Sequence, residues 1–322
     1  MSRSAPLPVN PRRMPWSEVP DAVVAGISAK TGAAVVSVAG SPLGFSPGFA
    51  GIVGFADGER LFLKVMSGVR DPWSIEFNRR EAEMLAILPL GVPAPRLRWT
   101  LELDEWLVVA IEAVDGEPLD PSREVAHADA IWEAISRLGG VAAHRELPIF
   151  HEHHWDAFTR WQALADAVDL DARLASLGED GDWVAARLDF LIEWEREAIE
   201  ASKGDALVHG DLRADNLVLT ASGIVIVDWP HASRGAAWLD LVGYLPSHEM
   251  YGGGSARAAF RAHSLSLGVT NAQERAFVAA LAGYFTVQST EPAVPALPGL
   301  REFQRAQAVP ALNWLREVAS AT

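Results

Sequence analysis

A polar loop between two short apolar segments contains the residues best suited to chemistry. The loop runs from His209 to Asn216, and the apolar segments at 206–208 and 217–219 predict short buried strands. A folding domain gains little stability from such a polar loop. A carboxylate such as that of Asp211 can accept or orient the proton of an attacking hydroxyl, and Asn216 can hold a Mg²⁺ ion on phosphate groups. The loop is therefore the first candidate for a reaction centre.

The spacing within this loop is specific. His209, Asp211 and Asn216 form the pattern H-x-D-x-x-x-x-N, which is the spacing of a kinase catalytic loop. A β-branched segment at 224–227 follows and ends in Asp228, at the place where a second Mg²⁺ ligand belongs, so that Asp228-Trp-Pro stands where kinases have Asp-Phe-Gly. Either aspartate alone could simply cap a turn. The joint occurrence of all four residues in register favours a phosphate-transfer site.

A lysine inside an apolar strand is the next candidate. Lys30, Lys64 and Lys203 are the only lysines among 27 basic residues, so the chain otherwise uses arginine for positive charge. Lys64 lies in the predicted strand 61–66, where a compact ammonium is suited to the α- and β-phosphates of ATP. The alternative is a lysine that extends to solvent from an edge strand.

A helical pattern over 76–90 supplies the expected partner of this lysine. Glu81 precedes the apolar ridge of that helix and is the preferred partner, with Glu83 as the second choice. Residues two positions apart point to different sides of a helix, so only one of them can face the strand.

The segments on either side of Lys64 predict a nucleotide site. A Gly-rich turn at 44–51 precedes it, and turns of this kind let backbone N–H groups approach phosphate oxygens, with Ser46 adding a hydroxyl. Two further strands are predicted at 97–103 and 106–112. The extended backbone at Glu112 and Ala113 could hydrogen-bond an adenine edge. By itself the Gly-rich turn is a weak signal, because such loops usually just connect strands.

Composition limits the class of protein. The 322 residues suffice for one large or two coupled domains, and 49% of them are hydrophobic, including 12 tryptophans. The net charge of −15 argues against nucleic acid and against an anionic membrane as partners, and it permits an acidic cleft for a cationic substrate. The absence of cysteine excludes disulfides and Cys-bound metals. With no signal peptide or long apolar run, we expect a soluble cytoplasmic protein, monomeric or homodimeric.

The periodicity changes along the chain. Strand patterns dominate up to about residue 113, and Val114 to Pro118 is interpreted as a hinge. Helical patterns follow at 128–143, 155–175, 183–201, 256–266, 272–284 and 303–318. We therefore predict an α+β, two-lobe fold. It comprises an N-terminal extension (1–22), a nucleotide-binding lobe with a small antiparallel sheet and one helix (23–113), and a larger, mainly helical lobe with the catalytic loop and acceptor site (114–322).

Taken together, the motifs resemble the aminoglycoside phosphotransferase-type small-molecule kinases, relatives of the protein-kinase fold. The resemblance is carried by His209-Gly-Asp-Leu-Arg-Ala-Asp-Asn216, by Asp228-Trp-Pro and by Gly44-Phe-Ser-Pro, and also by Phe62-Leu-Lys64, Arg80-Glu-Ala82 and Trp238-Leu-Asp240. His-Gly-Asp in place of His-Arg-Asp points to this family rather than to protein kinases.

The resemblance implies a role for each site residue. Asp211 would be the catalytic base, with His209 and Arg213 in the same loop. Asn216 and Asp228 would bind Mg²⁺, and Lys64 with Glu81 would position the phosphates. Ser46 would lie in the nucleotide-covering loop, and Asp240 would brace the catalytic loop without reacting.

The expected activity is transfer of the γ-phosphoryl group of ATP, or of GTP, to a hydroxyl of a small molecule. An aminoglycoside or another cationic antibiotic fits the acidic composition. A metabolic kinase acting on an amino sugar, a sugar, or a choline-like or homoserine-like alcohol fits the same motifs. The alternative that is not an enzyme is a catalytically silent ligand-binding protein with the kinase fold. We disfavour it because every expected catalytic position is filled.

Overall fold

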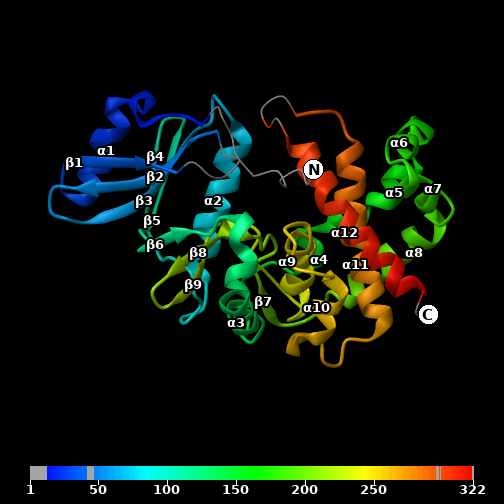
Figure 1. Cartoon of the computed structure of the whole chain (residues 1–322). Helices are drawn as coiled ribbons and strands as arrows, with labels where there is room; N and C mark the ends of the chain where they lie inside the picture. The colour runs from blue at the N-terminus through cyan, green and yellow to red at the C-terminus, as the bar shows by residue number, and fades with distance from the viewer. Residues whose placement is uncertain (1–12, 42–46, 295–296, 298, 321–322) are drawn as a thin grey trace. The chain divides into compact units, whose positions relative to one another are not determined.

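The computed structural model describes residues 13–41, 47–294, 297 and 299–320 (Figure 1). Two compact units are distinguished among them. The sheet unit comprises residues 13–119 and 215–231, and the helical unit comprises residues 120–214 and 232–320. The sheet unit thus includes a hairpin from the second half of the sequence. The assignment of nucleotide binding and acceptor binding to separate parts of the chain stays a prediction.

The sheet unit is built on a five-stranded antiparallel sheet in the order β1-β2-β3-β5-β4. Its strands are β1 (Val35–Gly40), β2 (Phe49–Phe55), β3 (Arg60–Ser67), β4 (Leu97–Leu103) and β5 (Trp106–Glu112). The bounds of β4 and β5 confirm the predicted strands. A smaller sheet in the order β6-β8-β9 joins Gly116–Pro118 to the hairpin of Leu217–Thr220 and Gly223–Ile226.

Two helices pack on the five-stranded sheet, one more than the sequence indicated. The first, α1 (Asp21–Thr31), follows the short 3-10 helix η1 (Trp16–Glu18) and buries Val23 and Ile27 against Leu61, Leu63 and Val65 of β3. The second, α2 (Pro72–Ile87), packs Ala82 against Leu107 and Val109 of β5. It begins before the predicted residue 76 because Asp71 caps it by accepting the Trp73 N–H at 3.1 Å, with proline in the first turn.

The register of the central strands fixes the direction of Lys64. Lys64 pairs with Val109 across β3 and β5. Val109 belongs to the side of the sheet that packs against α2. Side chains paired across two strands share one face of a sheet, so Lys64 faces α2 while its neighbours Leu63 and Val65 face α1.

The helical unit contains most of the helices. They are α3 (Ala128–Gly139), α4 (Phe150–His153), α5 (Arg160–Ala165), α6 (Leu170–Ser176), α7 (Glu179–Ala185), α8 (Leu188–Ala201), α9 (Leu239–Met250), α10 (Ala256–Ala262), α11 (Asn271–Thr290) and α12 (Leu300–Ser320). Short 3-10 helices lie at Pro121–His127, Trp155–Phe158 and Ser264–Ser266, and another, Ala214–Asn216, runs from this unit into the sheet unit. The strands β7 (Ala206–Val208) and β10 (Ser233–Gly235) pair antiparallel.

Most predicted helices lie where the structure has helices, but several of them are shorter than predicted. The segment predicted as one helix over 155–175 is divided into the 3-10 helix Trp155–Phe158, α5 and α6, and the segment over 183–201 is divided between α7 and α8. Helix α9 was not predicted. It is buried on nearly all sides and contains Pro246, so it lacks the amphipathic period that marks a surface helix.

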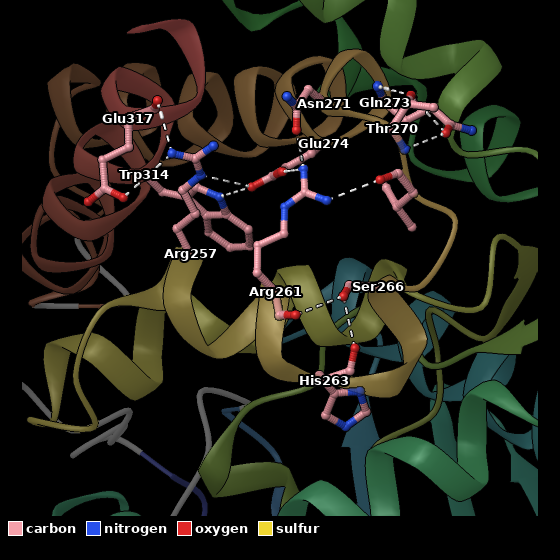
Figure 2. A network of polar contacts seen from close by, with 11 residues as sticks. Arg257, Arg261, His263, Ser266, Thr270, Asn271, Gln273, Glu274, Trp314 and Glu317 are labelled. Atoms are coloured by element: carbon pink, nitrogen blue, oxygen red, sulfur yellow. Dashed lines mark hydrogen bonds and ion pairs between the residues drawn. The ribbon is translucent and has the colours of Figure 1, made fainter. Parts of the chain in front are cut away.

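A buried carboxylate links the last three helices (Figure 2). Glu274 of α11 is fully buried and forms an ion pair with Arg261 of α10, while the indole N–H of Trp314 of α12 donates to it at 2.7 Å. Arg257 lies 3.5 Å from the same carboxylate. Two arginines and an indole thus compensate a charge that would be costly if buried alone.

Within the described ranges, no helix is both long enough and apolar enough to cross a membrane.

Candidate active site

Lys64 lies between two carboxylates in the sheet unit. Its Nζ atom is 2.7 Å from Oε2 of Glu81 and 2.7 Å from Oδ1 of Asp228. Glu81 is fully buried on α2, whereas Glu83 is exposed, so the helical period selects Glu81 as the partner. Three residues far apart in the sequence therefore form one charged cluster.

The electrostatics of this cluster follow from burial and from the opposite charges. Burial alone would lower the pKa of Lys64, but the charges of Asp228 and Glu81 outweigh it and raise that pKa above its usual value. Burial raises the pKa of Glu81, and the positive charge of Lys64 opposes the rise. Lys64 is thus held as an ammonium ion, which is the form that can bind phosphate.

Asp228 has an unusual backbone. Its φ angle is 68°, in the left-handed region that non-glycine residues rarely adopt. Its side chain is 31% exposed, enough to reach a ligand. The preceding Val227 N–H donates to the carbonyl of Asn216 at 2.9 Å, which holds the two proposed metal ligands in neighbouring segments of the same unit. Backbone strain of this kind is often found at functional sites.

The first part of the proposed catalytic loop, which lies in the helical unit, is held by Asp240 in the first turn of α9. Its two carboxylate oxygens accept the backbone N–H groups of His209 at 2.7 Å and Gly210 at 2.9 Å. His209 is fully buried, and its Nδ1 atom accepts the N–H of Asp211 at 3.3 Å. Gly210 has φ 81°, a conformation that suits glycine. Burial raises the pKa of Asp240, while the charge of His209 and the two N–H groups oppose that rise.

Asp211 forms an ion pair with an arginine of the same loop. Nη1 of Arg213 is 2.5 Å from Oδ1 of Asp211, and the Asp211 side chain is 31% exposed. The guanidinium of Arg213 lies 5.9 Å from the centre of the Phe303 ring. The carboxylate proposed as the base is thus accessible, and a cation holds one of its oxygens.

Tyr284 is a residue near the proposed base that the sequence did not indicate. Tyr284 of α11 is partly buried, and Arg160 lies 5.7 Å from the centre of its ring while also pairing with Asp156 at 2.5 Å. Burial raises the pKa of the Tyr284 hydroxyl, and the negative charges of Asp211 and Asp156 add to the rise. Tyr284 is therefore within electrostatic range of the proposed base. Its position within a long helix gave no sequence signal.

The structure gives less information about the other residues that were predicted to bind the nucleotide. Glu112 ends β5, and its N–H already donates to the carbonyl of Arg96 at 2.9 Å; Ala113 follows directly after the strand. Their contact with adenine stays a prediction. Ser46 lies outside the described residues.

The comparisons with known proteins give one result that bears on this geometry. The family model described as the phosphotransferase enzyme family (APH) matches residues 52–281, well over half of the chain. The matched range includes Lys64, Glu81, the catalytic loop, Asp228 and Asp240. No curated protein matches the chain.

Enzymes of this family use ATP and a divalent metal and act on small-molecule substrates. The chain therefore belongs to the phosphotransferase enzyme family, and it is a kinase-type enzyme that transfers phosphate to a hydroxyl acceptor.

Proposed function

We propose that this protein transfers the γ-phosphoryl group of ATP, or of GTP, to a hydroxyl of a cationic small molecule. The observation that carries the proposal is the Lys64 cluster, in which one buried ammonium lies 2.7 Å from both Glu81 and Asp228. An ammonium with this much opposing charge remains protonated, and it can exchange its contact with Asp228 for the phosphates of a nucleotide.

Asn216 and Asp228 would hold the divalent metal, for which Mg²⁺ is the proposal. An amide oxygen and a carboxylate are the hard oxygen donors that Mg²⁺ prefers, and it usually takes its remaining ligands from water and substrate phosphates. The partly exposed Asp228, held in a strained conformation, supports this assignment. When bound, the metal would neutralise charge on the phosphates.

Asp211 would act as the base. Its carboxylate would accept the proton of the acceptor hydroxyl as that oxygen forms a bond to the γ-phosphorus, while the bond from this phosphorus to the β–γ bridging oxygen breaks and ADP departs. Arg213 contacts Oδ1 of Asp211 and would orient the carboxylate toward the hydroxyl. Asp240 fixes the loop backbone through His209 and Gly210. Positioning of this kind is the main protein contribution to phosphoryl transfer.

The acceptor would be an aminoglycoside or another cationic antibiotic, which implies a role in resistance or self-protection. The net charge of −15 supports a cationic acceptor. Tyr284 and Phe303 near the base are candidates to contact it. The alternative is a metabolic kinase for an amino sugar, a sugar, or a choline-like or homoserine-like alcohol, which would use the same phosphoryl-transfer residues.

The test is ADP release with Mg-ATP and then Mg-GTP, measured against a panel of aminoglycosides, cyclic-peptide antibiotics, amino sugars and amino alcohols. Asp211→Ala serves as the blank. Release that depends on one acceptor class and vanishes in Asp211→Ala is the expected result. Acceptor-dependent release that persists in Asp211→Ala would overturn the role of the base, and release with uncharged sugars alone would overturn the cationic acceptor.

A further inference from the structure

A short N-terminal arm, residues 13–16, is built into the core of the sheet unit. Met14 is 4% exposed and belongs to the same apolar cluster as Phe49 and Val53 of β2. The ring of Trp16 packs edge-on against Phe49, with 4.9 Å between ring centres. The arm is therefore part of the packed unit, in a segment that carries no recognisable sequence motif.

The arm is hydrogen-bonded to Ser41, directly after β1, and to Pro47, two residues before β2. Nη1 of Arg13 donates to the carbonyl of Ser41 at 3.0 Å, and the N–H of Met14 donates to the carbonyl of Pro47 at 2.9 Å. Beyond Pro47, Gly48 approaches β3 so closely that a Cβ atom would lie 2.5 Å from the carbonyl oxygen of Val65. Ser41 and Pro47 thus both contact the arm, and Gly48 lies against the strand that carries Lys64.

The guanidinium of Arg13 lies within the electrostatic influence of Asp228. Burial lowers the pKa of Arg13, and the charge of Asp228 opposes that shift. Asp228 is also the carboxylate that contacts Lys64. Geometry also connects Arg13 to the strand of Lys64, because Ser41, which accepts from Arg13, donates its N–H to the carbonyl of Ala50 at 2.8 Å, and Ala50 is the register partner of Lys64. The formal charges of Arg13, Lys64, Glu81 and Asp228 sum to zero. A divalent metal added to this set would leave an excess of positive charge for an anionic ligand to neutralise.

We propose that Arg13 is a phosphate-binding residue of the nucleotide site, positioned there by the N-terminal arm. A guanidinium presents a planar fork of N–H donors that matches phosphate oxygens, whereas the ammonium of Lys64 acts as a point charge. Once Asp228 is committed to a metal, phosphate oxygens would compensate the charge of Arg13 in its place. The inference rests on the proposed nucleotide-dependent activity and adds to it a residue that precedes the range matched by the family.

Two substitutions separate phosphate binding from a purely structural role. Arg13→Gln keeps a donor for the Ser41 carbonyl and removes the charge. Arg13→Lys keeps the charge and removes the fork. The matched control is Arg70→Gln, because Arg70 lies in the same unit, is exposed, and pairs with Glu18 of the neighbouring η1 helix at 2.7 Å.

The experiment is calorimetric titration of the full-length protein with ATP, AMP and adenosine, each with and without Mg²⁺, together with the melting temperature of every variant. We expect Arg13→Gln to weaken Mg-ATP binding by about 10- to 100-fold, the typical size of a lost charge-assisted hydrogen bond, with adenosine binding unchanged. Arg13→Lys should give a smaller loss, and Arg70→Gln should bind as the wild type does. If Arg13→Gln does not fold, the affinity of Arg13→Lys for Mg-ATP decides the test.

Three outcomes would overturn the inference. The first is that Arg13→Gln and Arg13→Lys bind Mg-ATP as tightly as the wild type does. The second is that adenosine and ATP binding weaken equally, which would assign the arm a structural role. A wild-type protein that binds no nucleotide would overturn the proposed function as well, whereas ATP binding that is indifferent to Arg13 would remove this inference alone.

Discussion

Glu81 in the sheet unit and Asp240 in the helical unit are both buried carboxylates that contact candidate functional residues, and they are compensated in opposite ways. Glu81 faces an ammonium, Lys64, at 2.7 Å. Asp240 faces two backbone N–H groups, those of His209 and Gly210. The first arrangement balances charge, and the second fixes the path of the main chain.

The difference matches what each region must do. In the proposed function, the ion pairs of Lys64 would rearrange when a nucleotide and a metal bind, because each ion pair can be exchanged for a new one. A loop held by backbone hydrogen bonds is less free to rearrange, so the proposed base that it carries would stay in place through the reaction. We therefore expect charge changes to act mainly on ligand binding in the sheet unit, and on turnover in the helical unit.

The largest expected effect concerns the base. Asp211→Asn should lower kcat by about 10²- to 10⁴-fold, the usual contribution of general base catalysis. Steady-state ADP release with the acceptor found by screening measures it. The control is Asp171→Asn, an exposed carboxylate of α6, which should retain wild-type kcat. A variant Asp211→Asn with wild-type kcat would show that the helical unit does not supply the base.

The next largest effect concerns the buried ion pair. Lys64→Met should reduce the free energy of unfolding by about 3–5 kcal/mol, because Glu81 would be left buried without its cation. Adding Glu81→Gln in the same chain should recover much of that loss, since no buried charge then remains at position 81. Urea denaturation of both variants measures the free energy.

The matched control for this cycle is Lys203→Met. Lys203 also pairs with a glutamate, Glu200, but both side chains are exposed, so its loss should change the free energy of unfolding by less than about 1 kcal/mol. A double variant as unstable as Lys64→Met would mean that Glu81 and Lys64 are not coupled.

Asp240→Asn tests the brace of the catalytic loop. An amide has one carbonyl oxygen, so it can accept only one of the two N–H groups well and turns its own NH₂ group toward the other. We expect a loss of about 1–3 kcal/mol in unfolding free energy and a fall in kcat at unchanged acceptor KM. Asp205→Asn, an exposed neighbour of β7, is the control. An altered acceptor KM with full kcat would place Asp240 in binding instead.

The smallest expected effect is a change in the free energy of unfolding per pH unit. It concerns a second carboxylate of the helical unit that is held by backbone N–H groups. Glu195 of α8 accepts the N–H of Arg160 at 2.5 Å and that of Trp161 at 3.1 Å. Burial raises the pKa of Glu195 to about 7, although these N–H groups oppose the rise. An acid with a raised folded-state pKa contributes stability below its unfolded pKa, and this contribution is lost as pH rises through the folded pKa.

Glu195→Gln should therefore flatten the pH dependence of stability between about pH 4.5 and 7. The wild type should lose about 1 kcal/mol per pH unit in that window relative to the variant. Melting or urea curves at several pH values measure the difference. Parallel curves for the two proteins would show that Glu195 is not shifted.

The sequence was most informative where residue types and spacing were both constrained. Strands β4 and β5 have alternating or continuous apolar patterns bounded by polar turns, and their limits agree with prediction. The preference for Glu81 over Glu83 followed from the 3.6-residue period of one helix. The spacing of His209, Asp211 and Asn216 indicated a kinase-type loop, and the other motifs, together with His-Gly-Asp in place of His-Arg-Asp, indicated the family.

Other features depend on contacts that no local pattern records. Helix α9 is buried on most sides, so it lacks the amphipathic period by which α3 is recognised. Arg13 and Tyr284 reach their positions only through tertiary packing, one from an arm before the first helix and one from within a long helix. The contact of Asp240 with the loop spans about thirty residues, and the resemblance to a family supplied that expectation where periodicity could not.

The most direct test of the division between the two regions is magnesium-dependent ATP binding, measured by calorimetry on Asp211→Asn and Asp228→Asn without any acceptor. Asp211→Asn should bind Mg-ATP within about twofold of the wild type, whereas Asp228→Asn should lose the gain in affinity that Mg²⁺ confers. Equal losses in both variants, or a full magnesium effect in Asp228→Asn, would contradict the assignment of metal and phosphates to the sheet unit and of the base to the helical unit.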